Sequence, residues 1–138
     1  MVAFVKWVKD FSIGVVGIDN QHKRMVSMIN RLHKSIPAGA VDSEIDLVLK
    51  SLVDYTQYHF AAEEELMQEI QFPDYQRHRR LHLDLTAQVT DMMVTLKHGK
   101  ELTVFELITF LKRWLVEHII KEDRKIGDAI AARVGNAL

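Results

Sequence analysis

The sequence contains no cysteine, only two prolines, no block of basic residues and no long uncharged apolar run. The lack of cysteine excludes disulfide bonds, thiolate zinc sites, iron–sulfur clusters and cysteine nucleophiles. The formal net charge is −1, so electrostatics give no reason to expect nucleic acid or an anionic membrane as a partner.

No stretch is suited to spanning a membrane or to directing secretion. The most apolar segment, residues 102–120, is interrupted by charged or titratable side chains: Glu106, Lys112, Arg113, Glu117 and His118. Such a segment is not expected to insert into a membrane. The N-terminus lacks a basic region followed by an apolar one, so no signal peptide is expected and the expected location is the cytoplasm.

What the sequence does contain is a repeated helical pattern of apolar residues, and no stretch shows the alternation of a strand. The 138 residues, 48% of them apolar, suit one soluble domain spanning 1–138. Four long amphipathic helices with short connections predict an all-α, up-down-up-down antiparallel four-helix bundle. The expected elements are an arm over 1–17, helices over about 19–36, 43–70, 74–97 and 103–121, and a short C-terminal helix over about 125–133.

The expected helices begin at polar capping residues and end at helix breakers. The expected N-caps are Asp19, Ser43, Asp74 and Thr103. The expected breakers are Pro37, Gly39, Pro73 and Gly99.

The densest set of possible metal ligands flanks the turn at Pro73. His59 and Glu63 are four residues apart, as are His78 and His82, so each pair shares one face of its helix. The turn folds the two helices back on each other and brings both pairs to a similar level. Three imidazoles and a carboxylate between two helices indicate a metal site.

The other two helices supply possible ligands at the same level. Both members of an antiparallel helix pair rise about 1.5 Å per residue, so residues equidistant from their connection face each other. By this count His22 lies opposite His59, and His118 lies opposite His82. The resulting layer contains His22, His59, Glu63, His82 and His118. His78 lies one turn away.

A single buried histidine is more often a core residue than a ligand, but four of the seven histidines lie in this layer beside a carboxylate and a fifth, His78, lies one turn away. A buried Glu63 would also be costly without a positive partner. His33 and His98 do not fit the layer and are expected to be solvated polar residues. After His118 the next acidic residues are Glu122 and Asp123, and the spacing of a regular helix favours Glu122.

These residues resemble the hemerythrin family, in its single-domain bacterial form. The matching segments are Ile18–His22, His59–Glu63, His78–His82 and Trp114–Asp123. They extend from the end of the arm to the last helix. Each spacing alone is common, but HxxxE, HxxxH and HxxxxD in this order form a specific pattern.

The resemblance implies a non-haem di-iron site with an oxo or hydroxo bridge and O2 as its ligand. Its pattern assigns three histidines to one iron, namely His78, His82 and His118. It assigns two to the other iron, namely His22 and His59. The carboxylates that bridge both irons would be Glu63 and Asp123, so the resemblance selects Asp123 over Glu122.

These ligands leave one position open, on the iron with two histidines. By the same resemblance an apolar pocket surrounds that position, and its wall would consist of Met25, Phe60, Trp114, Leu115 and Ile119. Ordinary core packing would account for the same five residues. An apolar wall would keep out water and acid.

The function implied is reversible O2 binding for storage, delivery or sensing, by a protein that is not an enzyme. The alternative is a di-iron enzyme or a protein that handles nitric oxide or peroxide. Ferritin-like di-iron enzymes use Glu-x-x-His pairs, and this sequence has none. A structural zinc or manganese site fits less well, since seven donors exceed the four of a tetrahedral zinc. A monomer is expected, and no protein recipient of the oxygen is identified.

Overall fold

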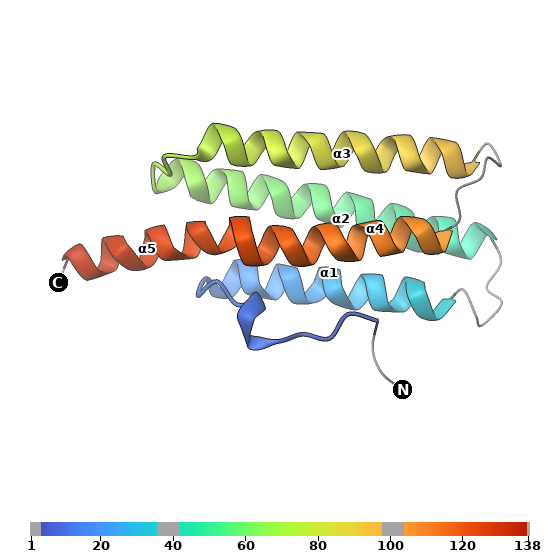
Figure 1. Cartoon of the computed structure of the whole chain (residues 1–138), viewed down its shortest axis with the longest axis horizontal. Helices are drawn as coiled ribbons and strands as arrows, with labels where there is room; N and C mark the ends of the chain where they lie inside the picture. Colours follow the sequence, from blue (N-terminus) through green and yellow to red (C-terminus); the bar gives the residue numbers. More distant parts are fainter. Residues whose placement is uncertain (1–3, 36–41, 98–103, 138) are drawn as a thin grey trace.

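The computed structural model describes residues 4–35, 42–97 and 104–137. Its elements, in chain order, are η1 (Lys9–Phe11), α1 (Val16–Ser35), α2 (Asp42–Glu69), α3 (Tyr75–Lys97), α4 (Val104–His118), η2 (Ile119–Asp123) and α5 (Arg124–Ala137). Helices α1 to α4 alternate in direction, and α5 extends from the end of α4 along nearly the same axis (Figure 1). Each of the four packs against the next, and α4 packs against α1. The predicted antiparallel four-helix bundle is confirmed.

The structure tests the predictions that the chain has no strand and no membrane-spanning segment. Within the described ranges every regular element is helical. None of the described helices combines the length and the apolarity that crossing a bilayer requires.

The first helix begins earlier than predicted. The backbone N–H of Asp19 donates to the carbonyl oxygen of Val15 at 2.8 Å, so Asp19 lies inside the first turn of α1 rather than at its N-cap. Its carboxylate instead accepts hydrogen bonds from the Ser12 hydroxyl and the Ile13 N–H, both at 2.8 Å. Asp19 therefore fastens the N-terminal arm to the bundle.

The last helix is also different from the prediction. A short, separate helix over 125–133 was expected after a break near residue 121. Instead α4 runs through the π-helical turn η2 directly into α5, which extends to Ala137. The chain stays helical because a π-turn continues the hydrogen-bonded ladder with a wider spacing rather than ending it.

The remaining helix ends lie within a residue or two of their predicted positions where the structure describes them. Helix α2 begins at Asp42 and ends at Glu69, where the Phe72 N–H bonds back to the Met67 carbonyl and Gln71 adopts a positive φ of 54°. The helix is thus terminated by a residue in the left-handed backbone conformation, a common way for an α-helix to end. The breakers Pro37, Gly39 and Gly99, and the cap Thr103, lie outside the described residues.

Two apolar clusters fill the bundle, one on either side of the layer where the histidines lie. The larger joins α1 to α4 and includes the fully buried Leu32, Leu107 and Ile108. The smaller, built on Met67, Phe72 and Ile126, packs α5 against the α2–α3 turn. The polar layer is thereby enclosed along the bundle axis.

The arm reaches α5 at a point where only glycine fits. A Cβ added to Gly127 would overlap the carbonyl oxygen of Ile13. Beside this contact, the Arg124 guanidinium donates to the Asp10 carbonyl at 2.8 Å.

We expect the substitution G127A to lower the free energy of unfolding by about 1–3 kcal/mol, because the arm or the helix must move to admit a methyl group. The control is G17A, since a Cβ at Gly17 meets nothing within 4 Å, and alanine in a helix is equal or better by up to about 1 kcal/mol. Urea denaturation of both variants measures the difference. Equal stability of G127A and wild type would mean that the arm is not held against α5.

Candidate metal centre

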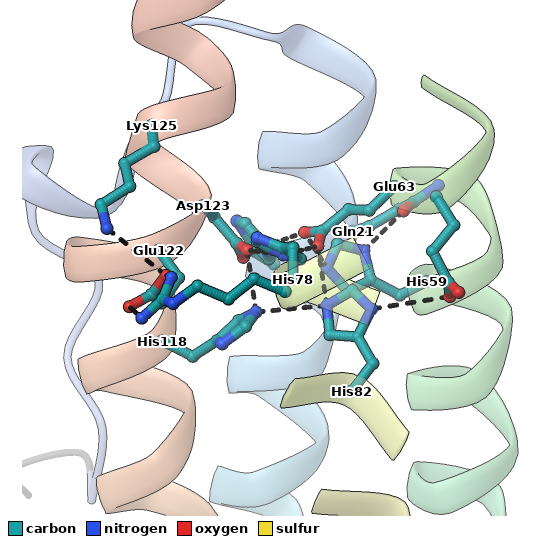
Figure 2. A network of polar contacts seen from close by, with 12 residues as sticks. Gln21, His59, Glu63, His78, His82, His118, Glu122, Asp123 and Lys125 are labelled. Carbon is teal, nitrogen blue, oxygen red and sulfur yellow. Dashed lines mark hydrogen bonds and ion pairs between the residues drawn. The ribbon is translucent and has the colours of Figure 1, made fainter. Parts of the chain in front are cut away.

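All seven residues predicted as metal ligands come together at one level of the bundle. They are His22 on α1, His59 and Glu63 on α2, His78 and His82 on α3, His118 on α4 and Asp123 on η2. Every one is buried. Figure 2 shows the labelled members of this set, His59, Glu63, His78, His82, His118 and Asp123, pointing toward one another between the helices.

Glu63 divides its two carboxylate oxygens between two sets of histidines. Its Oε2 lies 2.7 Å from Nε2 of His59 and 3.3 Å from Nε2 of His22. Its Oε1 lies 3.2 Å from Nε2 of both His78 and His82. One carboxylate thus faces both sets at once.

Asp123 repeats this division from the opposite side. Its Oδ2 lies 2.9 Å from Nε2 of His22. Its Oδ1 lies 3.0 Å from Nε2 of His78 and 2.9 Å from Nε2 of His118. Two groups of possible ligands result, His22 with His59 and His78 with His82 and His118, and both include Glu63 and Asp123.

The donor set fits a pair of metal ions. Both oxygens of Asp123 are buried and, among the described residues, neither has a partner in hydrogen-bonding geometry, although imidazole nitrogens lie within 3.0 Å. Leaving such a carboxylate unsatisfied is costly. Nitrogen and carboxylate donors that converge in this way are typical of iron and other first-row metals.

The π-turn explains why Asp123 rather than Glu122 faces the centre. In a π-turn the hydrogen bonds span five residues rather than four, so the residue five after His118 takes the place that the fourth would have in an α-helix. Glu122 points away and accepts two hydrogen bonds from Arg77, at 2.5 and 3.0 Å. The expectation from a regular helix, which favoured Glu122, is wrong for this segment.

The five expected pocket residues all belong to the larger apolar cluster beside the centre. Met25, Phe60, Leu115 and Ile119 are buried in it and Trp114 is half-buried against it. Two of their rings stack on imidazoles: Phe60 on His82, with centroids 3.8 Å apart, and Trp114 on His118, at 4.2 Å. Burial and stacking fit both a pocket wall and core packing.

The two histidines left out of the predicted site lie elsewhere or cannot be placed. His33 is near the end of α1, where its ring stacks on Phe4 with centroids 4.2 Å apart. It is half-buried rather than fully solvated, because the arm covers it. His98 lies outside the described residues.

Two residues that sequence reasoning missed contact the far side of the imidazoles. The amide oxygen of Gln21 lies 2.6 Å from Nδ1 of His59, and Oε2 of Glu64 lies 3.5 Å from Nδ1 of His82. Each precedes or follows a ligand residue in the sequence and therefore points about 100° away from it, toward the neighbouring helix. Their position next to a ligand residue was the sequence feature that could have identified them.

The buried imidazoles and carboxylates of the centre shift one another's pKa. Burial alone would lower the pKa of His22 and of His78, but close contacts with Asp123 and Glu63 outweigh it and raise each to about 9. Burial would raise the pKa of Glu63 and Asp123, but the facing imidazoles hold both well below their ordinary range. Both carboxylates are therefore ionised at neutral pH.

These shifts predict how the stability of the metal-free protein depends on pH. The unfolded imidazole has a pKa of 6.5, and in the fold His22 and His78 titrate near 9. Because the folded value is the higher one, this stabilisation is complete below pH 6.5 and is lost as the pH rises through 9. We expect the free energy of unfolding to fall by roughly 3 kcal/mol for each of the two imidazoles between pH 6.5 and 9.5.

Urea denaturation of the iron-free protein at several pH values tests this expectation. The iron-loaded protein is the control, because imidazoles bind metal in the neutral form and the same loss should be absent. A flat profile for the iron-free protein would show that the two imidazoles do not retain their protons in the fold.

Comparisons of the sequence and of the structure with known proteins both find similarity to hemerythrins. The family model described as "Hemerythrin HHE cation binding domain" matches residues 14–130. A bacteriohemerythrin of Stenotrophomonas maltophilia is 38% identical over 136 residues, which is 96% of this chain and 86% of that protein. A bacteriohemerythrin of Methylococcus capsulatus is 32% identical and covers 95% of this chain and 100% of its own length. The crystal structure of a wild-type hemerythrin superposes with a TM-score of 0.84 at 32% identity, covering 92% of this chain and 98% of that one.

Proposed function

The chain belongs to the hemerythrin family, and on this premise we propose that it binds O2 reversibly at a non-haem di-iron centre in the bundle. One observation carries the proposal. Each of the two buried carboxylates directs one oxygen at each set of histidines. A carboxylate placed in this way can bridge two ions, whereas one ion would leave an oxygen of each without a positive partner.

We assign the ligands as the two groups of donors suggest. His78, His82 and His118 would hold one iron. His22 and His59 would hold the other. Glu63 and Asp123 belong to both groups and would bridge the pair. The two-histidine half supplies one donor fewer, so a small external ligand would bind to the iron held there.

When bound, two ferrous ions supply the electrons that reversible binding of O2 requires. The chain's own part is to hold and shield them. Glu63 and Asp123 are ionised and offset the ions' charge without needing a proton. Phe60, Leu115 and Ile119 are buried beside the imidazoles and exclude water and acid from the centre.

We propose that the centre holds O2 rather than activating it, and hence that the protein is not an enzyme. The donor set contains five imidazoles and two carboxylates. Ferritin-like di-iron enzymes use more carboxylates and Glu-x-x-His pairs. Fewer anionic ligands make high-valent iron less accessible, which favours a carrier.

We also propose that the protein acts as a monomer, since one chain supplies all seven donors. Its cytoplasmic location stays a prediction. The donors do not distinguish between storage, delivery and sensing, and the proposal covers all three.

The test is the visible spectrum of the iron-loaded protein, reduced without air and then exposed to it. We expect two irons per chain, a new absorption band in air and loss of that band under vacuum. Irreversible bleaching within seconds would contradict the carrier and favour an oxidase. The iron-free protein, treated identically, is the control for absorption that does not depend on the metal.

A further inference from the structure

The imidazoles of the centre present Nε2 toward the carboxylates, so their other nitrogen, Nδ1, faces the surrounding helices. What Nδ1 contacts fixes the ring's orientation and tautomer and changes the basicity of Nε2. Two of the five histidines have a polar side chain of a neighbouring residue at that position.

His59 has a neutral partner. Its Nδ1 lies 2.6 Å from the amide oxygen of Gln21, which is half-buried on α1. The Nδ1–H donates to this oxygen, so in the neutral ring the lone pair is on Nε2, on the Glu63 side, where it would bind a metal ion. Gln21 therefore orients the ring without adding charge.

At His82, Nδ1 is buried and has no hydrogen-bond partner among the described residues, but an anionic group lies near it. Oε2 of Glu64 lies 3.5 Å from its Nδ1, and the other oxygen lies 3.4 Å from Nε of Arg79. The Glu64 side chain is 22% exposed, whereas that of Arg79 is 48% exposed. Solvent therefore screens the arginine more than it screens the carboxylate's field at His82.

We propose that Gln21 and Glu64 are positioning residues of the metal centre, and that their difference in charge makes its two halves electronically unequal. The negative charge near Nδ1 makes His82 a more electron-donating ligand than it would be beside a neutral group, so Glu64 favours ferric iron in the three-histidine half, whereas Gln21 adds no such charge to the two-histidine half. This inference rests on the proposed function, because it assigns His82 and His59 to different irons.

Removing the charge at Glu64 tests one half of the inference. In E64Q the side chain keeps its length and an acceptor oxygen but loses the negative charge. We expect the iron-loaded protein to keep two irons while its reduction midpoint becomes more positive and its conversion to the ferric form in air becomes slower. The matched control is E65Q, which makes the same change at an exposed neighbour on α2 and should behave like wild type.

Adding a charge at Gln21 tests the other half. We expect Q21E to shift the midpoint in the negative direction and to speed ferric conversion. The control N20D adds the same charge at the exposed preceding residue on α1. Removing the acceptor of the His59 hydrogen bond, in Q21A, should make iron release to a ferrous chelator faster by roughly 10-fold or more.

The outcomes separate this inference from the function on which it rests. Wild-type protein that takes up two irons and oxygenates, with E64Q matching E65Q and Q21E matching N20D in midpoint, would overturn the positioning roles alone. Wild-type protein that binds no iron would overturn the proposed function and the inference together. Circular dichroism of each iron-free variant establishes that a changed midpoint does not arise from a changed fold.

Discussion

Replacing Glu63 with alanine is expected to reduce bound iron to less than one ion per chain, where wild type holds two. Glu63 contacts both sets of histidines through different oxygens, so its loss removes a ligand from each half. It is also fully buried, so no solvent-exposed carboxylate can move into its place. The measurement is iron content after loading under reducing conditions and desalting.

The isosteric variant E63Q separates loss of charge from loss of volume. Glutamine fills the same space but cannot bridge two cations as an anion, so E63Q should also hold clearly less than two irons. The control is E65A on the same helix, whose side chain is exposed and which should load fully. Full occupancy in both Glu63 variants would remove this residue from the site.

The second large effect concerns iron content after substitution of two adjacent carboxylates, one of which should be essential for iron binding and the other not. D123A should bind less than one iron per chain, because Asp123 directs one oxygen at each set of histidines. E122A should retain two irons, because Glu122 points away and pairs with Arg77. The cost of E122A is the loss of an ion pair whose Arg77 side chain is exposed and whose Glu122 side chain is half-buried, and such a pair is worth roughly 0–1 kcal/mol.

Iron content and the oxygenated spectrum of the two variants measure this contrast directly. If E122A lost its iron while D123A kept it, the π-turn would not be present in solution and the helix would be regular there. If both kept it, neither carboxylate would be a ligand. The pair is informative because the two substitutions differ by one position in the chain.

Much of this molecule could be predicted from the sequence. In straight antiparallel helices, the number of residues between a side chain and the connecting turn determines its height along the bundle axis. The helical periodicity indicated the bundle, and counting residues from each connection placed His22 opposite His59. The resemblance to hemerythrins, drawn from the same residues, is confirmed by the family match and by relatives of similar length.

The rest depends on features that periodicity does not contain. A count along a regular helix cannot foresee a π-turn, so residue types and spacing alone favoured Glu122 over Asp123. Asp19 looks like an N-cap in sequence, yet its carboxylate bonds to the arm at Ser12 and Ile13. Gln21 and Glu64 are adjacent to ligand residues in the sequence, but which imidazole each lies near depends on the neighbouring helix.

The enclosure of the donor layer between two apolar clusters also bears on how the centre is filled. A hydrated ferrous ion cannot cross packed side chains such as Phe60 on one side or Met67 on the other. Its ligands come from every helix of the bundle, so they are assembled only when the chain has folded. Iron loading therefore requires local opening of the bundle or takes place during folding. The rate of iron uptake should then follow the rate at which the helices separate and should not depend on the concentration of ferrous iron.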